Sequence, residues 1–266
     1  MTTAPAVRLD VDGEVLRATI DRPRTRNAIS VEVIAGLEAM VEVAREEGVK
    51  VVVLRGADGT FCSGADLREL RALIHDPAGL RAFMTRLGTV LSQLERAPWV
   101  NVAVVEGHAV AGGCELLLAC DVVVAAEDAR IGDRHVEYGL VPAGGGSVRL
   151  PRAIPALHAR YLLLTGETIS GTEAAARGLA TIAVAPAQLD AELERILARL
   201  RSRGRATLRT VKAMLDDPAS AAGAGAALDR EIDLFLAHVA TAPDVRIGLD
   251  AFHDRVAPAF DGERQL

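Results

Sequence analysis

The first segments of the chain alternate between apolar and polar residues. Residues 7–12 and 15–21 show near-alternation on either side of an Asp-Gly pair, which is the pattern of two strands joined by a tight turn. Ser30 then precedes apolar residues spaced three and four apart over 33–44. This spacing predicts an amphipathic helix with Ser30 as its N-cap, and Gly48 marks its end.

Three later segments consist largely of β-branched and small apolar residues, at 49–54, 100–105 and 122–126. Such a run is typical of a strand buried on both faces of a parallel sheet. A glycine-containing loop and then helical spacing follow the first two runs, with the helical residues at 67–94 and 114–119. The repeat of strand, loop and helix predicts an α/β protein with a mostly parallel sheet.

The second half of the chain changes character. Its pattern is helical at 156–164, 172–177, 187–201, 205–215 and 226–240, with one short strand at 181–184 and a loop at 218–225. We therefore expect an α/β core over residues 1–200 and a helical C-terminal subdomain over residues 201–266.

The composition narrows the class of protein. The 266 residues are 50% hydrophobic and 25% charged, with a formal net charge of −6, as in an ordinary globular protein. An acidic balance disfavours nucleic-acid binding, which needs a basic surface. Aromatic residues make up only 3% of the chain, which argues against base-stacking platforms. We expect no nucleic-acid partner.

The longest apolar stretch, at 107–126, contains Glu115 near its middle and Asp121 six residues later. A carboxylate at the centre of a bilayer costs about 2.5–3.5 kcal/mol on insertion scales, so the stretch is interpreted as protein core and no membrane partner is expected. The three cysteines lack C-x-x-C spacing, and the first ten residues lack a signal-peptide pattern, which predicts a cytoplasmic protein without disulfides. No histidine has metal-ligand spacing, so no metal site is expected.

Two loops that each connect a predicted strand to a predicted helix consist largely of small residues. Residues 59–67 follow the strand at 49–54, and residues 107–115 follow the strand at 100–105. Small residues let a ligand approach the backbone. Two such loops at the ends of neighbouring strands can each aim one N–H group at a common point, as an oxyanion hole requires. The alternative for the first loop is a plain turn in which Asp66 caps a helix.

Glu115 lies in the first turn of the helix that follows the second loop. An exposed carboxylate there would interact favourably with the helix dipole. Burial among the leucines at 116–118 would instead raise its pKa and suit it to proton transfer. The residue pattern alone leaves both interpretations open.

The order of several motifs resembles the crotonase (enoyl-CoA hydratase/isomerase) superfamily. The motifs are RP…NA at 22–28, F…SGADL at 61–67, GGCEL followed by CD at 112–121, GLVP…GG at 139–146, LTG at 164–166 and AF…PAF at 251–260. The resemblance covers nearly the whole chain. It implies an α/β fold built as a spiral of ββα units, with a helical C-terminal subdomain that serves assembly into homotrimers or hexamers and forms part of the ligand site.

The resemblance also implies an acyl-coenzyme A thioester as substrate, with no cofactor beyond the coenzyme A moiety of that substrate. At the matching positions, the backbone N–H groups of Ala65 and Gly112 would hold the thioester oxygen and stabilise an enolate. Coenzyme A would lie against the residues around those amides and a C-terminal segment of the same or a neighbouring subunit: Arg24, Arg26, Ala28, Ser63, Asp66, Leu67, Phe252 and Arg255. Positive charge at Arg24 and Arg26 suits phosphate groups, and the alternative is a solvated basic turn.

The chain departs from the family at one catalytic position. Hydratases of this family use two glutamates on opposite sides of a water molecule. The first matches Glu115, whereas alignment on Gly139 and Pro142 places His135 at the second. Histidine exchanges protons near neutral pH, so Glu115 and His135 make a workable pair. Glu137 would reach the site only in a remodelled loop, and a structural role for His135 is the alternative.

Three reactions agree with the resemblance. Hydration of a 2-enoyl thioester would use Glu115 as base toward water and His135 or Glu137 as the acid at C2, and the presence of Glu115 favours this reaction. A hydrolase or C–C bond-cleaving (retro-Claisen) enzyme would use His135 to activate water, but the acidic residue of such members matches Gly144 here. Isomerisation of the double bond by a single base is the third. A subunit that binds acyl-CoA without catalysis is a further alternative, against which Glu115 argues.

Overall fold

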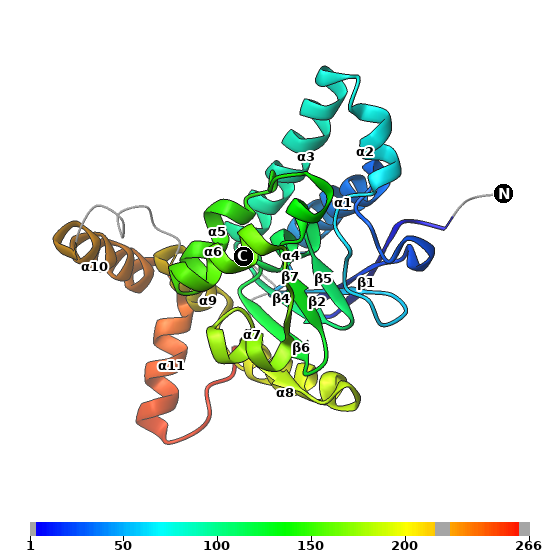
Figure 1. Ribbon diagram of the computed structural model, residues 1–266. Coiled ribbons are helices and arrows are strands. Elements are labelled where there is room, and N and C mark those ends of the chain that lie inside the picture. Colours follow the sequence, from blue (N-terminus) through cyan, green and yellow to red (C-terminus); the bar gives the residue numbers. More distant parts are fainter. Residues whose placement is uncertain (1–3, 216–223, 261–266) are drawn as a thin grey trace.

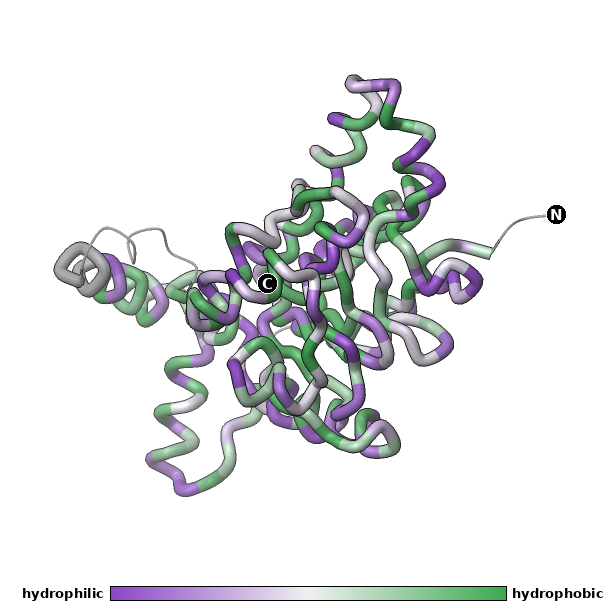
Figure 2. The backbone as a smooth tube through the Cα atoms, in the orientation of Figure 1, coloured by the Kyte–Doolittle hydropathy of each residue, from purple (hydrophilic) through white to green (hydrophobic). Residues whose placement is uncertain are grey.

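The computed structural model describes residues 4–215 and 224–260. In Figure 1 these residues form an α/β body from which two C-terminal helices, α10 (Ala224–Thr241) and α11 (Pro243–Asp254), project to one side. Figure 2 shows hydrophobic residues concentrated along the strands at the centre of the body, while hydrophobic and hydrophilic positions alternate along the projecting helices.

The N-terminal segments form the predicted hairpin. β1 (Val7–Asp12) and β2 (Val15–Ile20) pair antiparallel, with Asp12 opposite Val15. The turn between them contains Gly13 at φ +60°, in the left-handed region that glycine adopts without steric cost.

The main sheet has six strands in the order β1-β2-β3-β4-β6-β9, and every pair from β2 onward is parallel. Its remaining strands are β3 (Val51–Gly56), β4 (Val100–Val105), β6 (Val122–Ala126) and β9 (Ile182–Val184). The three β-branched runs supply β3, β4 and β6, and nearly all their residues are buried. The prediction of a mostly parallel sheet is confirmed. β3 begins two residues later than predicted because the N–H of Val49 bonds back to the carbonyl of Ala44 at the end of the preceding helix.

A second sheet was not predicted from the sequence pattern. Its order is β5-β7-β8, formed by His108–Val110, Arg130–Gly132 and Ile169–Ser170. Strands of two or three residues are too short to show a periodicity. β5 directly follows β4 and precedes α4, and β7 directly follows β6 and precedes η2. Both units have the ββα order that the resemblance implies.

Helices of the body begin with α1 (Val31–Glu46), where the Ser30 hydroxyl accepts a 3.2 Å hydrogen bond from the N–H of Val33. The segment predicted as one helix at 67–94 is two helices, α2 (Leu67–Leu73) and α3 (Pro77–Glu95). Proline lacks an N–H and is favoured at the first helical position, so Pro77 begins a new helix.

The remaining helices comprise one short helix before α1 and a series that begins after β5. They are η1 (Pro23–Thr25), α4 (Gly112–Leu117), η2 (His135–Tyr138), α5 (Gly146–Ala153), α6 (Ala156–Thr165), α7 (Gly171–Arg177), η3 (Pro186–Gln188), α8 (Leu189–Arg201) and α9 (Arg205–Leu215). Neither α5, which contains Pro151, nor α11, which contains Gly248, was predicted, because these residues weaken the helical signal. Residues 218–223 of the loop predicted at 218–225 lie outside the described residues. The last two residues of that predicted loop belong to α10, which begins at Ala224.

One buried ammonium group connects α9 to the sheet. Lys212 is 7% exposed, and its Nζ lies 2.7 Å from Asp121 Oδ2 and donates to the carbonyls of Leu94 and Trp99 at 3.1 and 3.0 Å. Burial raises the pKa of Asp121, and the Lys212 charge opposes that rise. The C-terminal helices are therefore tied to the body by a polar contact, and the division of the chain at residue 200 stays a prediction.

Candidate active site

The two small-residue loops lie against each other. They are linked by a parallel bridge between Cys62 and Ala109, and Gly64 has φ +93°. A Cβ atom at position 64 would lie 2.8 Å from the Cβ of Ala111 and 3.2 Å from the nitrogen of Gly112. Position 64 therefore requires glycine for both its conformation and its space, and that glycine lets the loops approach.

At this contact the backbone N–H groups of Ala65 and Gly112 have no acceptor among the described residues. Ile29 bonds to the carbonyl of Gly64 and the N–H of Asp66, both at 2.8 Å, which leaves the intervening N–H of Ala65 on the opposite side of the strand. The N–H of Gly112 begins α4 and has no acceptor within that helix. Neither group donates to another described residue, and both residues line the same cavity. Two unpaired backbone donors beside one cavity are a candidate oxyanion hole.

The residue that precedes Gly112 has a strained backbone. Ala111 has φ +51° and ψ −121°, a region that residues other than glycine rarely adopt. Its N–H donates to the carbonyl of Gly132 at 3.1 Å, so the second sheet holds this conformation. The strain lies beside one of the two unpaired amides.

Glu115 is buried, which decides between the two interpretations of its position. It projects from α4, is 2% exposed, and its Oε1 accepts hydrogen bonds of 2.8 Å from the N–H groups of both Gly144 and Gly146. Burial raises the pKa of Glu115, although the two amides and the charge of His135 oppose the rise. The carboxylate is thus held in one orientation with a pKa above its ordinary value.

His135 lies in η2 and lines the cavity together with Glu115. Its Nδ1 is 2.9 Å from Asp133 Oδ1, and its backbone N–H donates to the same oxygen at 3.2 Å. Burial, the largest single influence, disfavours the charged imidazole. The hydrogen bond and charge of Asp133 and the charge of Glu115 together outweigh burial and raise the pKa of His135.

Glu137 is not brought to the site. Its partly exposed carboxylate forms an ion pair with Arg134, which lowers the pKa of Glu137, and the residue does not line the cavity. The loop is not remodelled in the way that a role for Glu137 would need.

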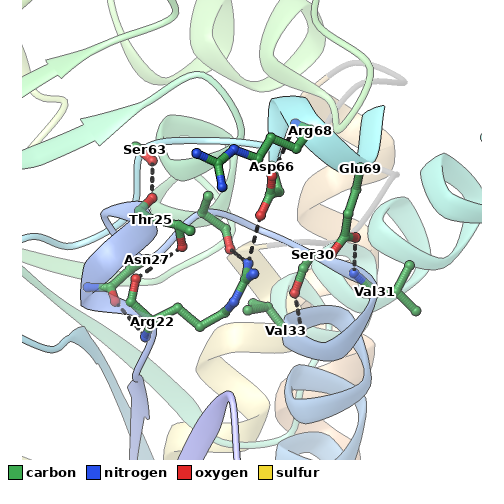
Figure 3. A network of polar contacts seen from close by, with 11 residues as sticks. Arg22, Thr25, Asn27, Ser30, Val31, Val33, Ser63, Asp66, Arg68 and Glu69 are labelled. Carbon is green, nitrogen blue, oxygen red and sulfur yellow. Dashed lines mark hydrogen bonds and ion pairs between the residues drawn. The ribbon is translucent and has the colours of Figure 1, made fainter. Parts of the chain in front are cut away.

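The arginines of the basic loop have different surroundings. Arg22 is turned inward, where its Nη1 bonds to Asp66 Oδ2 at 3.1 Å and to the carbonyl of Ala28 at 3.0 Å (Figure 3). Arg24 and Arg26 are exposed and line the cavity. Arg22 therefore joins the two loops, while the other two guanidinium groups are available to a ligand.

Of the other predicted ligand residues, Asp66 has the local role named as the alternative. Its Oδ1 accepts from the N–H of Arg68 at 3.1 Å and caps α2, while its Oδ2 binds Arg22. Asp66 also lines the cavity, as do Ala28, Ser63 and Leu67.

The cavity has a volume of about 560 Å³. Its apolar wall is formed by α2, α3, the turn between them and the loop after η2, with Leu70, Ile74, Leu80, Met84, Leu87, Leu140 and Val141.

The described residues include no group of three or more histidine, cysteine or acidic residues able to hold a metal ion, and no described helix is long and apolar enough to cross a membrane. All three cysteines are free thiols, and burial raises the pKa of Cys62 to about 12.

Phe252 and Arg255 lie away from the cavity of their own chain. Phe252 is 84% exposed on α11, and Arg255 follows that helix. Neither residue lines the cavity. Within one chain, the described residues thus do not place Phe252 or Arg255 in the wall of the predicted ligand site.

Sequence reasoning missed three residues that shape the site. Asp133 orients His135, and Gly144 and Gly146 hold Glu115. The glycine run at 144–146 was a visible signal for a close backbone approach. Nothing in the pattern connected it to a carboxylate about thirty residues earlier.

The chain is similar to known proteins over most of its length. The model of the enoyl-CoA hydratase/isomerase family matches residues 10–263. The enoyl-CoA isomerase/hydratase fer4 of Mycosarcoma maydis is 33% identical over 282 residues, covering 99% of this chain and 100% of that protein. The crystal structure of an enoyl-CoA hydratase from Bacillus anthracis superposes with a TM-score of 0.90 at 30% identity, covering 97% of this chain and 100% of that chain.

A further relative matches over a shorter stretch. The mitochondrial enoyl-CoA hydratase domain-containing protein 2 of Bos taurus is 39% identical over 168 residues, which are 62% of this chain and 56% of that relative. The matched part thus spans little more than half of the relative's length.

The ββα spiral is a crotonase fold, as the motifs indicated. The chain belongs to the enoyl-CoA hydratase/isomerase family, which is a family of enzymes.

Proposed function

We propose that the chain hydrates 2-enoyl-CoA thioesters and catalyses the reverse dehydration. The observation that carries this proposal is the convergence of four groups on one cavity: the free amides of Ala65 and Gly112, the buried carboxylate of Glu115 and the imidazole of His135. Two donors for an oxyanion and two groups able to exchange protons are what the addition of water to a conjugated thioester needs.

In the proposed reaction the thioester oxygen lies between the two amides. Glu115 takes a proton from water as the water oxygen bonds to C3, and the electron pair of the C2–C3 double bond moves toward the thioester oxygen as an enolate. His135, in its protonated form, then gives a proton to C2. Loss of one oxyanion donor costs about 2.7–4 kcal/mol of transition-state stabilisation in comparable sites, so the amides of Ala65 and Gly112 would supply much of the rate.

The electrostatics of the pair support these roles. Burial raises the pKa of Glu115, which makes its carboxylate a stronger base. The neighbouring carboxylates raise the pKa of His135, which makes the imidazolium available as an acid near neutral pH. The reaction needs no cofactor beyond the coenzyme A moiety of the substrate, because these side chains and the two amides supply the other groups.

Coenzyme A would enter at the basic side of the cavity. Arg24 and Arg26 are exposed there and can bind phosphate groups through charge-assisted hydrogen bonds. The apolar wall on α2 and α3 would then receive the acyl group.

We also propose that subunits assemble as trimers or hexamers through the C-terminal helices. Large apolar side chains on and just after α10 and α11 are between 44% and 84% exposed: Ile232, Phe235, Leu236, Val239, Leu249, Phe252 and Val256. Exposed large apolar side chains in this number on two helices are typical of a protein interface. Within such an assembly Phe252 and Arg255 would reach the ligand of a neighbouring subunit, and light scattering with Phe252→Ala tests this arrangement.

The test of the function is turnover of a short 2-enoyl-CoA, followed by the loss of conjugated-thioester absorbance. Wild-type protein is expected to hydrate the substrate, and Glu115→Gln and His135→Ala are each expected to lower kcat by about 10²–10⁴-fold. Absence of turnover in the wild type would contradict the proposal. Release of free thiol would assign hydrolysis instead, and movement of the double bond without addition of water would assign isomerisation.

A further inference from the structure

Asp133 is a buried carboxylate for which the proposed chemistry has no direct use. It follows β7, is 1% exposed, and lies two residues before His135. Arg134, between them, has φ +59°, so the chain folds back and brings both the backbone N–H and the ring of His135 to Asp133 Oδ1. The carboxylate therefore contacts the ring from its own segment.

The hydrogen bond determines which ring nitrogen carries the proton. Nδ1 lies 2.9 Å from a carboxylate oxygen, and an ionised carboxylate only accepts hydrogen bonds. Nδ1 must then be protonated in the neutral ring as well as in the charged ring. Nε2, on the other side of the ring, is the nitrogen that gains and loses the exchangeable proton.

We propose that Asp133 is a positioning residue for His135, which it holds in the Nδ1–H tautomer so that Nε2 delivers the proton to C2 of the substrate. This inference rests on the proposed hydration for the role of Nε2. The tautomer does not depend on the proposed hydration, because the contact between Nδ1 and Asp133 imposes it.

The charges around the ring agree with this role. Among the described residues, the charged groups that act on His135 are Asp133 from its own segment and Glu115 from α4. α6 also packs against η2 and contributes none. Asp133 and Glu115 approach the same point, since a Cβ at Gly146 would lie 3.1 Å from Asp133 Oδ2 and 3.2 Å from Glu115 Oε1.

This geometry accounts for histidine at position 135. A glutamate there would place a third carboxylate beside Asp133 and Glu115, and like charges in a buried site oppose one another's ionisation. An imidazolium instead neutralises part of the charge of both. Asp133 and His135 thus form a matched pair that takes the place of a single second glutamate.

The experiment uses Asp133→Asn, which keeps an oxygen able to accept the Nδ1–H and removes the charge. Nuclear magnetic resonance of the imidazole nitrogens would follow the titration of His135, with His135→Gln identifying its signals among the six histidines. The titration midpoint is expected to fall by about 1 unit or more. The alkaline limb of the pH profile of kcat is expected to move by the same amount, with KM within about twofold.

Glu137→Gln is the matched control. It removes a charge of the same sign two residues on the other side of His135, where the carboxylate binds Arg134 and does not line the cavity. The control is expected to leave the His135 titration in place. An unchanged titration in Asp133→Asn, or a lower kcat with an unshifted pH profile, would overturn the proposal.

The wild-type protein supplies a second measurement that does not depend on the stability of any variant. At high pH, neutral His135 is expected to carry its proton on Nδ1, whereas neutral histidine in water carries it mainly on Nε2. An Nε2–H tautomer would overturn the proposal. Because the tautomer is measured without substrate, failure of the hydration assay and failure of the Asp133 proposal are distinguishable.

Discussion

The N–H of Gly144 donates a 2.8 Å hydrogen bond to Glu115, and a Cβ atom at position 144 would lie 2.5 Å from Glu115 Oε2. The site can hold the carboxylate in this orientation only while residue 144 is glycine. Displacement of a proposed base by even 1 Å is enough to impair proton transfer.

Gly144→Ala is therefore expected to lower kcat at least about tenfold and to destabilise the fold by about 1–3 kcal/mol through overpacking. Steady-state kinetics and urea denaturation measure the two effects. Gly88→Ala is the matched control, because a Cβ there has no atom within 4 Å and alanine favours the helix by about 0.5–1 kcal/mol. Full activity in Gly144→Ala would contradict the assigned role of Glu115.

Glu115→Gln is expected to change the pH dependence of stability. A carboxyl group whose folded-state pKa is raised contributes stability below its unfolded pKa, and this contribution is lost as pH rises through the folded-state pKa. Glutamine does not titrate. The variant is thus expected to be more stable than the wild type at pH 8, with a difference that shrinks toward pH 4, measured as the free energy of unfolding at each pH. A constant difference would show that the carboxyl is not perturbed.

Ala111→Gly is expected to stabilise the protein. The strain of a non-glycine residue at φ +51° and ψ −121° costs about 1–3 kcal/mol, and the added freedom of glycine in the unfolded chain offsets about 0.4–1 kcal/mol. A net gain of about 1 kcal/mol is expected in urea denaturation. A loss of stability would mean that the methyl group contributes more packing than the backbone strain costs.

Replacing Arg24 and Arg26 together by glutamine is expected to raise KM about tenfold with kcat unchanged, because contacts to a distant part of the substrate affect binding and not the chemical step. The effect should diminish at high salt, where exposed charges are screened. Arg45→Gln provides a matched control, since Arg45 is exposed and pairs with Glu42. An unchanged KM would show that Arg24 and Arg26 form a solvated turn and do not bind the substrate.

Lys212→Met is expected to destabilise the fold by about 1–3 kcal/mol, because it removes the donor to the carbonyls of Leu94 and Trp99 and leaves the partly exposed carboxylate of Asp121 without its partner. The double variant with Asp121→Asn should recover part of this loss, since no uncompensated charge remains. Thermal and urea unfolding of the two variants and the wild type measure the difference. Equal stability of Lys212→Met and the wild type would show that the Lys212 contacts do not stabilise the fold.

The elements that the sequence predicts well are those whose pattern is long. The β-branched runs of β3, β4 and β6 and the amphipathic spacing of α1 are visible because burial imposes the same residue type at many positions. The strands of the second sheet have two or three residues each. Their pairing is decided by the loops between them, which no local pattern reports.

The candidate site was predictable to a similar extent. Ala65, Gly112, Glu115 and His135 all line the cavity, and the family motifs located each of them. Asp133 was missed because its contact with His135 depends on the positive φ of Arg134. Arginine rarely adopts this conformation, so the sequence does not predict it. The exclusion of Glu137 likewise follows from its ion pair with Arg134, which only the folded loop reveals.

The Lys212 contact sets an order in which the molecule can be completed. Its three acceptors lie 91 to 118 residues earlier in the chain. On the ribosome those oxygens therefore emerge before the ammonium group that binds them, which becomes available only when α9 is made. The three hydrogen bonds of Lys212 thus form only after α9 has been synthesised and has docked against the sheet. A helix made late therefore completes a core whose other parts were made much earlier.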